Sequence, residues 1–361
     1  MRAGLATLFL ALLAGTDAAD ADSLQLSSGP TRIYIEALAD RQDVNFELFL
    51  RNNGPVALSL RRVQLSVRDA QGRLLERRLI DGNGVRPSIQ TVSTRDVPAG
   101  ASLTVFNPFP SFARDLPIAT LQYELTLSAE ADDAPELVRS IEVHPLSRPG
   151  LTALDLPLRG PIINYDGHDA LAHHRRFDYS FAPLAQMGFK SNFMRYAYDF
   201  VPVDAQGEMV HGDFARNENF SGFGARVLAT GDGVVVALEN AMPDNRQFDK
   251  SRIAQNPMVL FGNYLVIDHG HGEFSVYGHL KQGSVKVKAG VRVHRGQAVA
   301  AIGASGSAFF PHLHYELQDG PTTAAEGLPS YFNDVRLLRG ATATALQHAT
   351  VDTGQIVEST R

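Results

Sequence analysis

Two histidines one residue apart, His312 and His314, stand in the segment Pro311-His-Leu-His-Tyr-Glu316. In a β-strand, side chains two residues apart share a face, so both imidazoles would point to one side while Leu313 packs on the other. Two adjacent imidazoles are half of a metal site. The chain also offers a carboxylate, Asp199, and a further imidazole, His279, that could complete such a site.

A hydrolytic zinc site takes three protein ligands and keeps a water in the fourth position, and the ion lowers the pKa of that water to about 7. Two histidines and one aspartate would leave zinc with a net positive charge that polarises a carbonyl group. We predict His314 and Asp199 as the first two ligands. Taken alone, His312 and His314 also fit two ordinary strand histidines, so the prediction rests on the combination. No His-Glu-x-x-His motif supplies a glutamate base.

Length and composition indicate an ordinary globular protein. The chain has 361 residues, more than one hydrophobic core usually organises, so we expect two domains. Its 44% hydrophobic and 20% charged residues are typical of folded chains. The net charge of -6 offers no basic surface, so nucleic acid is not a predicted partner. The absence of cysteine excludes disulfides, thiolate zinc ligands and a cysteine nucleophile.

Residues 1–22 have the layout of a secretory signal peptide. Met1-Arg2 precedes an apolar run over 5–14, and small residues follow, with cleavage expected between Ala18 and Asp22. The run is too short to span a bilayer as a retained helix, although an uncleaved anchor is the alternative. No later segment has the length and apolarity of a transmembrane helix. We therefore expect a periplasmic or secreted bacterial protein.

Residues 23–147 are predicted to form a β-sandwich of immunoglobulin-like character. Two runs alternate with polar residues, one through Val44, Phe46, Leu48 and Leu50 and the other through Leu121, Tyr123, Leu125 and Leu127. Turn sequences such as Asn52-Asn-Gly54 separate the short strands. The only histidine is His144, so this domain is expected to be a spacer or a partner-binding module.

The rest of the chain divides at a segment rich in proline and glycine. Residues 148–165 have linker composition and either hang free or pack as a strap. Residues 166–335 hold most of the histidines on short strands separated by glycine turns, which predicts a second all-β domain. Residues 336–361 are a mostly unpatterned tail to which we assign no function.

Several motifs of this second domain occur in one order and at characteristic spacing. They are Gly231-Asp-Gly-Val-Val235, Gly262-Asn-Tyr-Leu-Val-Ile-Asp-His-Gly270, Tyr277-Gly-His-Leu280, Ile302-Gly-Ala-Ser-Gly306 and Pro311-His-Leu-His-Tyr-Glu316. With them, the region from about 171 to 328 resembles the lysostaphin-like zinc metallopeptidases, which cut peptide bonds in bacterial cell walls. The resemblance implies a lysostaphin-like, barrel-sandwich-like antiparallel sheet, a Zn2+ cofactor and peptidoglycan peptides as substrate.

The resemblance also assigns roles to individual residues. It implies that Asp199 and His314 bind zinc, and that His279 and His312 are catalytic groups beside the metal and its water. The family's commonest form has its third ligand four residues before the aspartate, where this chain has Arg195. The upstream candidates are therefore His168, His173 and His174. One branch of the family has a Gly-His-Arg-Arg segment that Ala172-His-His-Arg-Arg176 resembles, so we predict His174, with His173 in reserve.

The expected chemistry needs a neutral imidazole near pH 7. His279 or His312 would accept the proton of the attacking water, stabilise the oxyanion and supply the departing amine. Glu316 shares the histidine face by alternation and either orients one imidazole or faces solvent. The long loops 203–220 and 239–257 are expected to line a groove, as a substrate gate or an autoinhibitory lid.

The sequence thus predicts an exported, zinc-dependent endopeptidase acting on peptidoglycan stem or cross-link peptides, with a cell-wall protein as a possible partner of the sandwich. One alternative is a catalytically inactive protein of the same fold that regulates cell-wall amidases. Another is an adaptor in which the sandwich binds the wall or a partner protein.

Overall fold

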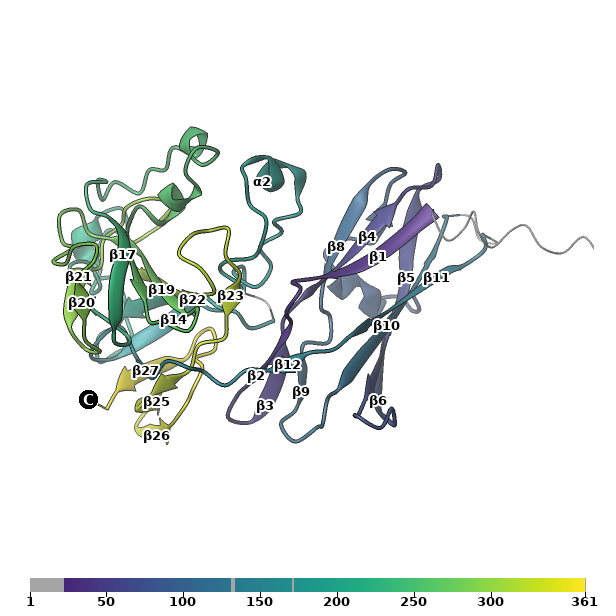
Figure 1. The fold of residues 1–361 in the computed structure, drawn as a ribbon, viewed down its shortest axis with the longest axis horizontal. Coiled ribbons are helices and arrows are strands. Elements are labelled where there is room, and N and C mark those ends of the chain that lie inside the picture. Colours follow the sequence, from purple (N-terminus) through teal and green to yellow (C-terminus); the bar gives the residue numbers. More distant parts are fainter. Residues whose placement is uncertain (1–22, 131–133, 171, 361) are drawn as a thin grey trace, which may run out of the picture. The chain divides into compact units, whose positions relative to one another are not determined.

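The computed structural model describes residues 23–130, 134–170 and 172–360. The predicted signal peptide, residues 1–22, lies outside this range. Within it the regular secondary structure is mostly β-strand, as predicted, and the helical elements are short (Figure 1). These elements are the α-helix α2 (Ala182–Gln186) and the 3-10 turns η1 (Ser88–Thr91), η2 (Asn217–Asn219), η3 (Lys250–Arg252) and η4 (Pro257–Phe261). In the described part of the chain, no helix has the length and apolarity that crossing a membrane requires.

The chain divides into two compact units, and the first contains residues 23–29, 46–109 and 117–144. Its strands pair in two antiparallel sheets among the described residues. One sheet has the order β1-β4-β8, with β1 (Leu24–Gly29), β4 (Glu47–Asn52) and β8 (Ser102–Phe106). The other has the order β11-β10-β5-β6, with β5 (Leu58–Arg68), β6 (Leu74–Asp81), β10 (Thr120–Ser128), β11 (Leu137–Val143), and β7 (Asp96–Val97) paired to β5.

The alternating pattern of β10 is confirmed by its burial. Leu121, Tyr123, Leu125 and Leu127 are all fully buried, as expected for one face of a strand that covers a core. The hydroxyl of Tyr123 donates a hydrogen bond to Asn107 Oδ1 at 2.5 Å, so its polar end is satisfied within that core. The sheets of this unit agree with the predicted all-β class, while its immunoglobulin-like character stays a prediction.

The predicted strand through Val44 and Phe46 is divided between the two units. β3 (Arg41–Val44) belongs to the second unit, whereas β4 begins at Glu47 in the first. Asn45 and Glu47, the polar residues of the pattern, are as buried as their apolar neighbours. The alternation there therefore does not mark a strand with one face in water.

The second unit contains residues 30–45, 110–116 and 145–360. One of its sheets has the order β12-β2-β3-β9, with β2 (Tyr34–Ala37), β9 (Ser111–Ala113) and β12 (Leu146–Ser147). The largest has 11 strands in the order β20-β17-β18-β19-β22-β15-β14-β27-β25-β26, with β23 paired to β22.

The strands of the large sheet are β14 (Ile162–Asp166), β15 (Tyr198–Pro202), β17 (Gly233–Glu239), β18 (Asn263–Asp268), β19 (Phe274–Leu280), β20 (Arg292–Val293), β22 (Leu313–Gln318), β23 (Gly327–Leu328), β25 (Val335–Arg339), β26 (Thr342–Leu346) and β27 (Ile356–Ser359). Two short pairs complete the unit, β13 (Leu154–Asp155) with β24 (Phe332–Asn333) and β16 (Arg226–Leu228) with β21 (Ala298–Ala301). The segment 336–361, predicted as a tail, thus supplies strands β25 to β27 to the sheet that carries β22.

The segment 148–165, predicted as a linker, packs against the second unit and contains β13 and most of β14. The fully buried carboxylate of Glu273 accepts hydrogen bonds from Arg148 Nη2 at 2.6 Å and from the Thr152 amide at 2.9 Å and hydroxyl at 2.6 Å. A buried carboxylate requires such donors, so this contact holds the segment in place. Of the two predicted alternatives, a segment that hangs free and one that packs as a strap, the structure contains the packed segment.

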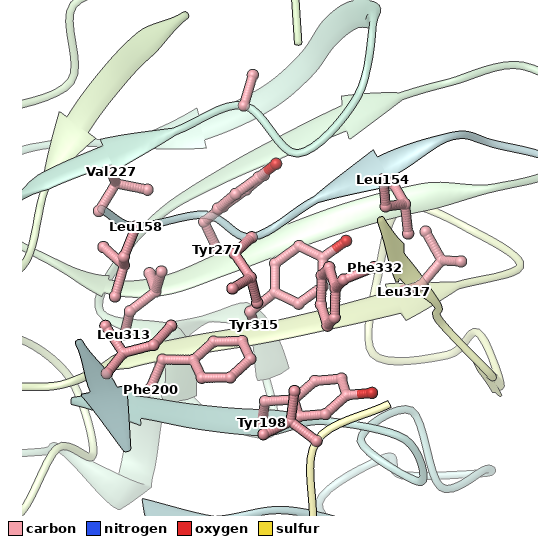
Figure 2. Packing of buried hydrophobic residues seen from close by; sticks show 14 of the residues in the cluster. Leu154, Leu158, Tyr198, Phe200, Val227, Tyr277, Leu313, Tyr315, Leu317 and Phe332 are labelled. Carbon is pink, nitrogen blue, oxygen red and sulfur yellow. The ribbon is translucent and has the colours of Figure 1, made fainter. Parts of the chain in front are cut away.

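An aromatic core lies under β15, β19 and β22 (Figure 2). The rings of Tyr198 and Phe200 stack at 5.0 Å, and Tyr315 lies 5.3 Å from Tyr277 and 5.6 Å from Phe332. The hydroxyls of Tyr277 and Tyr315 reach Thr230 and Ser275 at 2.8 and 2.9 Å. Because Leu313 and Tyr315 fill one face of β22, His314 between them must project from the other face.

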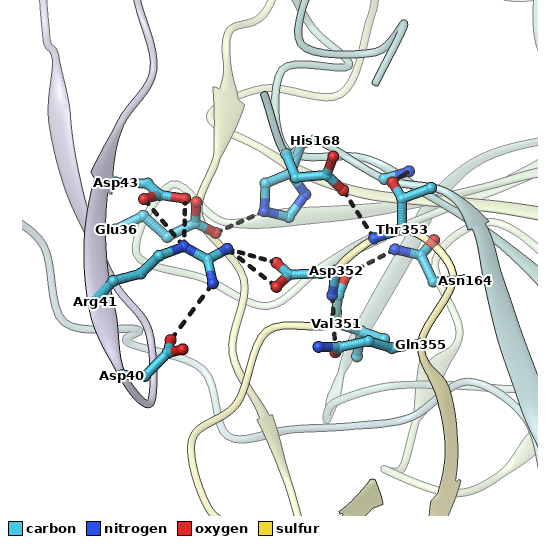
Figure 3. A network of polar contacts seen from close by, with 12 residues as sticks. Glu36, Asp40, Arg41, Asp43, Asn164, His168, Val351, Asp352, Thr353 and Gln355 are labelled. Carbon is cyan, nitrogen blue, oxygen red and sulfur yellow. Dashed lines mark hydrogen bonds and ion pairs between the residues drawn. The ribbon is translucent and has the colours of Figure 1, made fainter. Parts of the chain in front are cut away.

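A polar network holds the hairpin of β2 and β3 to the rest of the second unit (Figure 3). His168 Nε2 lies 2.7 Å from Glu36 Oε1, and His168 Nδ1 lies 3.4 Å from the Ala197 carbonyl. Both partners accept hydrogen bonds, so the buried imidazole carries two protons. Burial alone would lower the pKa of His168, but the charge of Glu36 outweighs it and raises the pKa to about 9.

We expect the stability that Glu36 contributes to be lost as the pH rises through about 9. A histidine whose pKa is higher in the folded than in the unfolded protein stabilises the fold fully at pH values below its unfolded-state pKa, near 6.5. This contribution disappears at pH values above its folded-state pKa. Tyr196 and Tyr198, which pack on His168, do not titrate in this range because burial raises their pKa well above 10. Thermal midpoints of wild type and Glu36→Gln should differ clearly near pH 6 and much less near pH 10. An equal gap at both pH values would contradict the assignment.

Candidate metal centre

His174, Asp199 and His314 are buried, and one potential ligand atom of each lies within 4.8 Å of the other two. Asp199 Oδ1 is 3.5 Å from His174 Nε2 and 3.1 Å from His314 Nδ1. These are the three side chains predicted as ligands. The structure therefore brings together residues that span 140 positions of the sequence.

Strand register places two of the three candidate ligands side by side. Asp199 in β15 lies directly opposite His314 in β22, and opposite residues on one face have neighbouring side chains. His174 comes from the turns that follow β14, the strand beside β15. Asn192 Nδ2 holds this segment by donating to the carbonyls of His174 and Arg175 at 2.9 and 3.1 Å.

Hydrogen bonds select which nitrogen of each ligand faces the centre. His174 Nδ1 donates to the Gly167 carbonyl at 3.0 Å, which leaves Nε2 with a free lone pair toward Asp199. His314 Nε2 lies 3.2 Å from Glu316 Oε2, which leaves Nδ1 toward Asp199. An imidazole whose second nitrogen donates to a carbonyl or carboxylate is arranged as metal-binding histidines are. Of the two alternatives for Glu316, the structure contains the one in which it orients an imidazole.

His279 and His312, the predicted catalytic residues, face the same centre. His279 Nδ1 donates to the Ser305 carbonyl at 2.9 Å, and His312 Nδ1 donates to the Phe310 carbonyl at 2.8 Å. Their Nε2 atoms are thus unprotonated in the neutral rings, and that of His312 lies 3.4 Å from Asp199 Oδ1. The two ring centroids are 4.7 Å apart. Both imidazoles are arranged to accept a proton at Nε2.

The backbone of β19 bends to deliver His279. Its φ is 58°, a left-handed conformation that costs a residue with a side chain about 1 kcal/mol and is often found at functional sites. The preceding Gly278 lies opposite His314, and a Cβ there would come within 2.9 Å of the Phe261 ring. Glycine therefore lets Phe261 pack on the His314 imidazole, 5.4 Å between centroids.

Arg195 stands where the commonest family pattern has a ligand, and it serves the fold instead. It is 1% exposed, and its Nε donates to Glu326 Oε1 at 2.5 Å. A guanidinium has no lone pair to offer a cation. His174, which approaches the centre from another segment, is the candidate third ligand in its place.

The two other upstream histidines have different surroundings. His168 is buried against Glu36, within the network of the β2–β3 hairpin. His173 is exposed and contacts the Asp166 carboxylate, although it lies next to His174 with ring centroids 4.1 Å apart. Asp166, His173 and His174 form a second group with clustered donors, but only its His174 is buried. The reserve ligand His173 therefore stands at the edge of the buried cluster.

Charge at the centre favours a cation. Burial would raise the pKa of Asp199, but His174 and His312 hold it well below its usual range. Burial lowers the pKa of His174 to about 3 and that of His279 well below 6.5. Burial would also lower the pKa of His314, yet its hydrogen bonds to Asp199 and Glu316 raise it to about 10. The two carboxylates thus stabilise a positive charge at His314. Either a proton or a divalent cation can supply that charge.

A pocket of about 90 Å3 opens over the cluster, which is room for a few water molecules. Its lining combines the five site residues with His173, Phe193, Met194, Leu260, Phe261, Ser307 and Phe309. Leu260 and Phe261 belong to η4, beyond the predicted loop 239–257. Among the described residues that line the pocket, none comes from 203–220 or 239–257. The gate or lid role predicted for these loops gains no support.

Sequence reasoning missed several groups around the site. The carbonyls of Gly167, Ser305 and Phe310 carry no side-chain signature, so only the fold reveals that they set the histidine tautomers. Ser305 could have been suspected, because it lies in the glycine-rich motif 302–306.

Glu316→Gln is expected to weaken zinc binding about 10- to 100-fold, the usual cost of removing a partner behind a metal-binding histidine. The glutamine keeps the shape but withdraws the negative charge that makes His314 more basic. Competition with a chromophoric chelator measures the affinity. The exposed Glu142→Gln serves as control, and wild-type affinity in Glu316→Gln would refute the role.

Comparison with known families agrees with this geometry. Residues 218–325 match the model of peptidase family M23. This part of the chain belongs to peptidase family M23. The M23 match contains His279, His312 and His314, whereas His174 and Asp199 lie before it. The lysostaphin-like resemblance predicted from the motifs is confirmed.

Curated relatives match over a limited part of the chain. Peptidoglycan DD-endopeptidase ShyA of Vibrio cholerae is 38% identical over 94 residues, which are 26% of this chain and 17% of that protein. Cell division protein DipM of Caulobacter vibrioides is 30% identical over 118 residues, which are 32% of this chain and 19% of that protein. The chain thus spans less than a fifth of the length of these relatives.

Among solved structures, the catalytic domain of the antimicrobial peptidase lysostaphin from Staphylococcus simulans is 20% identical, with a TM-score of 0.24. That match covers 37% of this chain and 74% of the other. The M23 assignment rests on the sequence matches.

Proposed function

We propose that this protein is an exported, zinc-dependent endopeptidase that hydrolyses peptide bonds in peptidoglycan stem or cross-link peptides. One observation carries the proposal: the buried His174, Asp199 and His314 share a centre with two further imidazoles, His279 and His312, in one pocket. The peptidoglycan substrate is supported by the relative ShyA, which is named a peptidoglycan DD-endopeptidase.

The donor set fits Zn2+. Two imidazole nitrogens and a carboxylate oxygen are the ligands of hydrolytic zinc sites, and here each imidazole has its other nitrogen hydrogen-bonded. His174, Asp199 and His314 would hold the ion. Bound there, zinc would act as a Lewis acid that polarises the scissile carbonyl and makes water a better nucleophile at neutral pH.

His279 and His312 would move the protons. In their neutral forms both present an unprotonated Nε2, because their Nδ1 atoms donate to backbone carbonyls. One of them accepts a proton from the attacking water, and the imidazolium then stabilises the oxyanion and protonates the departing amine. The carbonyl partners keep both rings oriented while the proton moves.

The proposal includes location and partners. The signal peptide expected in residues 1–22 would direct the protein to the periplasm or the exterior of a bacterium. The first unit, for which we propose an immunoglobulin-like sandwich, would bind a cell-wall protein or act as a spacer.

Digestion of purified sacculi tests the proposed activity. The wild-type protein is incubated with sacculi as purified, after treatment with a chelator, and after zinc is returned. We expect cross-linked muropeptides to be converted to smaller ones in the first and third reactions only, as seen by chromatographic separation. Release that persists after the chelator has removed all zinc would exclude a zinc peptidase. A protein that binds zinc yet releases nothing would favour the inactive regulator.

A further inference from the structure

The orientation of His174 depends on a backbone carbonyl. Its Nδ1 donates to the Gly167 oxygen at 3.0 Å, so the position of that carbonyl sets where Nε2 points. Residues 166–170 and 172–174 are here called the ligand loop. A Cβ at Gly167 would come within 2.5 Å of Asn164 Nδ2, so the loop passes close to β14. Contacts that hold residues 167 and 168 in place therefore also hold the orientation of the His174 imidazole.

Two segments distant in sequence hold this part of the loop (Figure 3). From the β2–β3 hairpin, Glu36 Oε1 accepts from His168 Nε2 at 2.7 Å, and the two side chains are 1% and 6% exposed. From the turn before β27, Thr353 Oγ1 accepts from the Gly167 amide at 3.0 Å, while the Thr353 amide donates to Asp169 Oδ2 at 2.8 Å. The ligand loop is thus bonded on both sides of the Gly167 carbonyl.

The hairpin and the turn are themselves joined. Arg41 Nη2 donates to both carboxylate oxygens of Asp352, at 2.9 and 3.0 Å, and Arg41 Nε contacts Asp43. A hydrogen bond between charged groups is stronger than one between neutral groups. The three segments therefore form one support, and the Glu36–His168 pair is the part of it buried against the loop.

We propose that Glu36 and His168 are positioning residues for the metal ligand His174, and that residues 30–45 are a functional part of the metal centre. Buried Glu36 fixes the His168 ring, the adjacent Gly167 carbonyl keeps its direction, and His174 Nε2 stays aimed at Asp199. A ligand that is oriented before the ion arrives binds it more tightly, because less freedom is lost on binding. This inference rests on the proposed zinc site.

Zinc affinity, measured by competition with a chromophoric chelator, tests the inference in the full mature chain. Glu36→Gln is expected to weaken zinc binding about tenfold, the lower end of the effect of partners behind a ligand. Asp40→Asn on the same hairpin is the matched control, because Asp40 is 78% exposed and contacts only Arg41 among the described residues. Its affinity should equal that of wild type. Far-ultraviolet circular dichroism shows that each variant is folded.

Two further measurements separate positioning from stability. Thr353→Val removes the acceptor of the Gly167 amide from an exposed position, so it should fold and still weaken zinc binding several-fold. In protein loaded with Co2+, the absorption bands, which report ligand geometry, should shift in Glu36→Gln and not in Asp40→Asn. Wild-type affinity and spectrum in both Glu36→Gln and Thr353→Val would overturn the inference alone. A wild-type chain that binds no zinc would overturn the proposed function together with it.

Discussion

Asp199→Ala is expected to emerge from gel filtration without zinc and to release no muropeptides from sacculi. The Asp199 carboxylate is the anionic member of the ligand group, and its Oδ1 lies 3.1 to 3.5 Å from nitrogens of His174, His312 and His314. Without it, two imidazoles would have to hold the ion without the carboxylate that lies next to both of them. Removing the hydrogen-bond partner of a metal ligand lowers metal affinity by up to roughly 100-fold. Removing Asp199 itself should lower zinc affinity by more than this.

Asp232→Ala is the matched control for this change. Asp232 is an aspartate of the same unit, and its side chain is 71% exposed. It is distant in sequence from the residues that line the pocket. Zinc content measured by atomic absorption and release of muropeptides should both match wild type in the control. One bound zinc per chain in Asp199→Ala would remove this residue from the ligand set and leave the centre unexplained.

His279→Ala and His312→Ala are expected to keep their zinc and to cleave about 10²- to 10⁴-fold more slowly, the usual contribution of a positioned acid or base. Neither residue belongs to the ligand group His174, Asp199 and His314. Both rings line the pocket with Nε2 unprotonated, so their loss removes proton transfer and leaves the metal-binding atoms in place.

Single-turnover rates on sacculi, at matched zinc occupancy, measure the effect of the two histidines separately. His294→Ala, a histidine with a side chain 76% exposed, should cleave at the wild-type rate. If one of the two variants kept the wild-type rate while the other lost activity, the active imidazole would be identified. Wild-type rates in both would exclude histidine acid-base chemistry at this site.

Much of the strand structure followed from local pattern, because alternation reports which face of a strand is buried wherever the other face meets water. β10 obeys this rule from Thr120 to Leu125, and the glycine-rich motifs mark turns between strands of the M23 region. The pattern failed where both faces are buried. The stretch through Asn45 and Glu47 alternates as a half-buried strand does, yet it is the place where the chain passes from one unit to the other.

Domain boundaries were harder to predict for a related reason. Composition predicted residues 148–165 as a linker. However, Arg148 and Thr152 donate hydrogen bonds to the carboxylate of Glu273, which is more than a hundred residues later in the sequence. Similarly, nothing in residues 30–45 distinguishes a hairpin of the first unit from one of the second. Contacts between distant segments decide such questions, and no local window contains them.

The sequence by itself determined the donor types and the strand that presents them. The His-x-His spacing places His312 and His314 on one face, and the resemblance to the lysostaphin-like family implies that Asp199 and His279 are their companions. Only the tertiary structure decided between His168, His173 and His174. The three lie within seven residues of each other, so the path of one turn selects which imidazole is buried at Asp199, which pairs with Glu36 and which meets solvent. That path depends on hydrogen bonds from residues 36 and 353, and their nearness to the loop exists only in the folded chain.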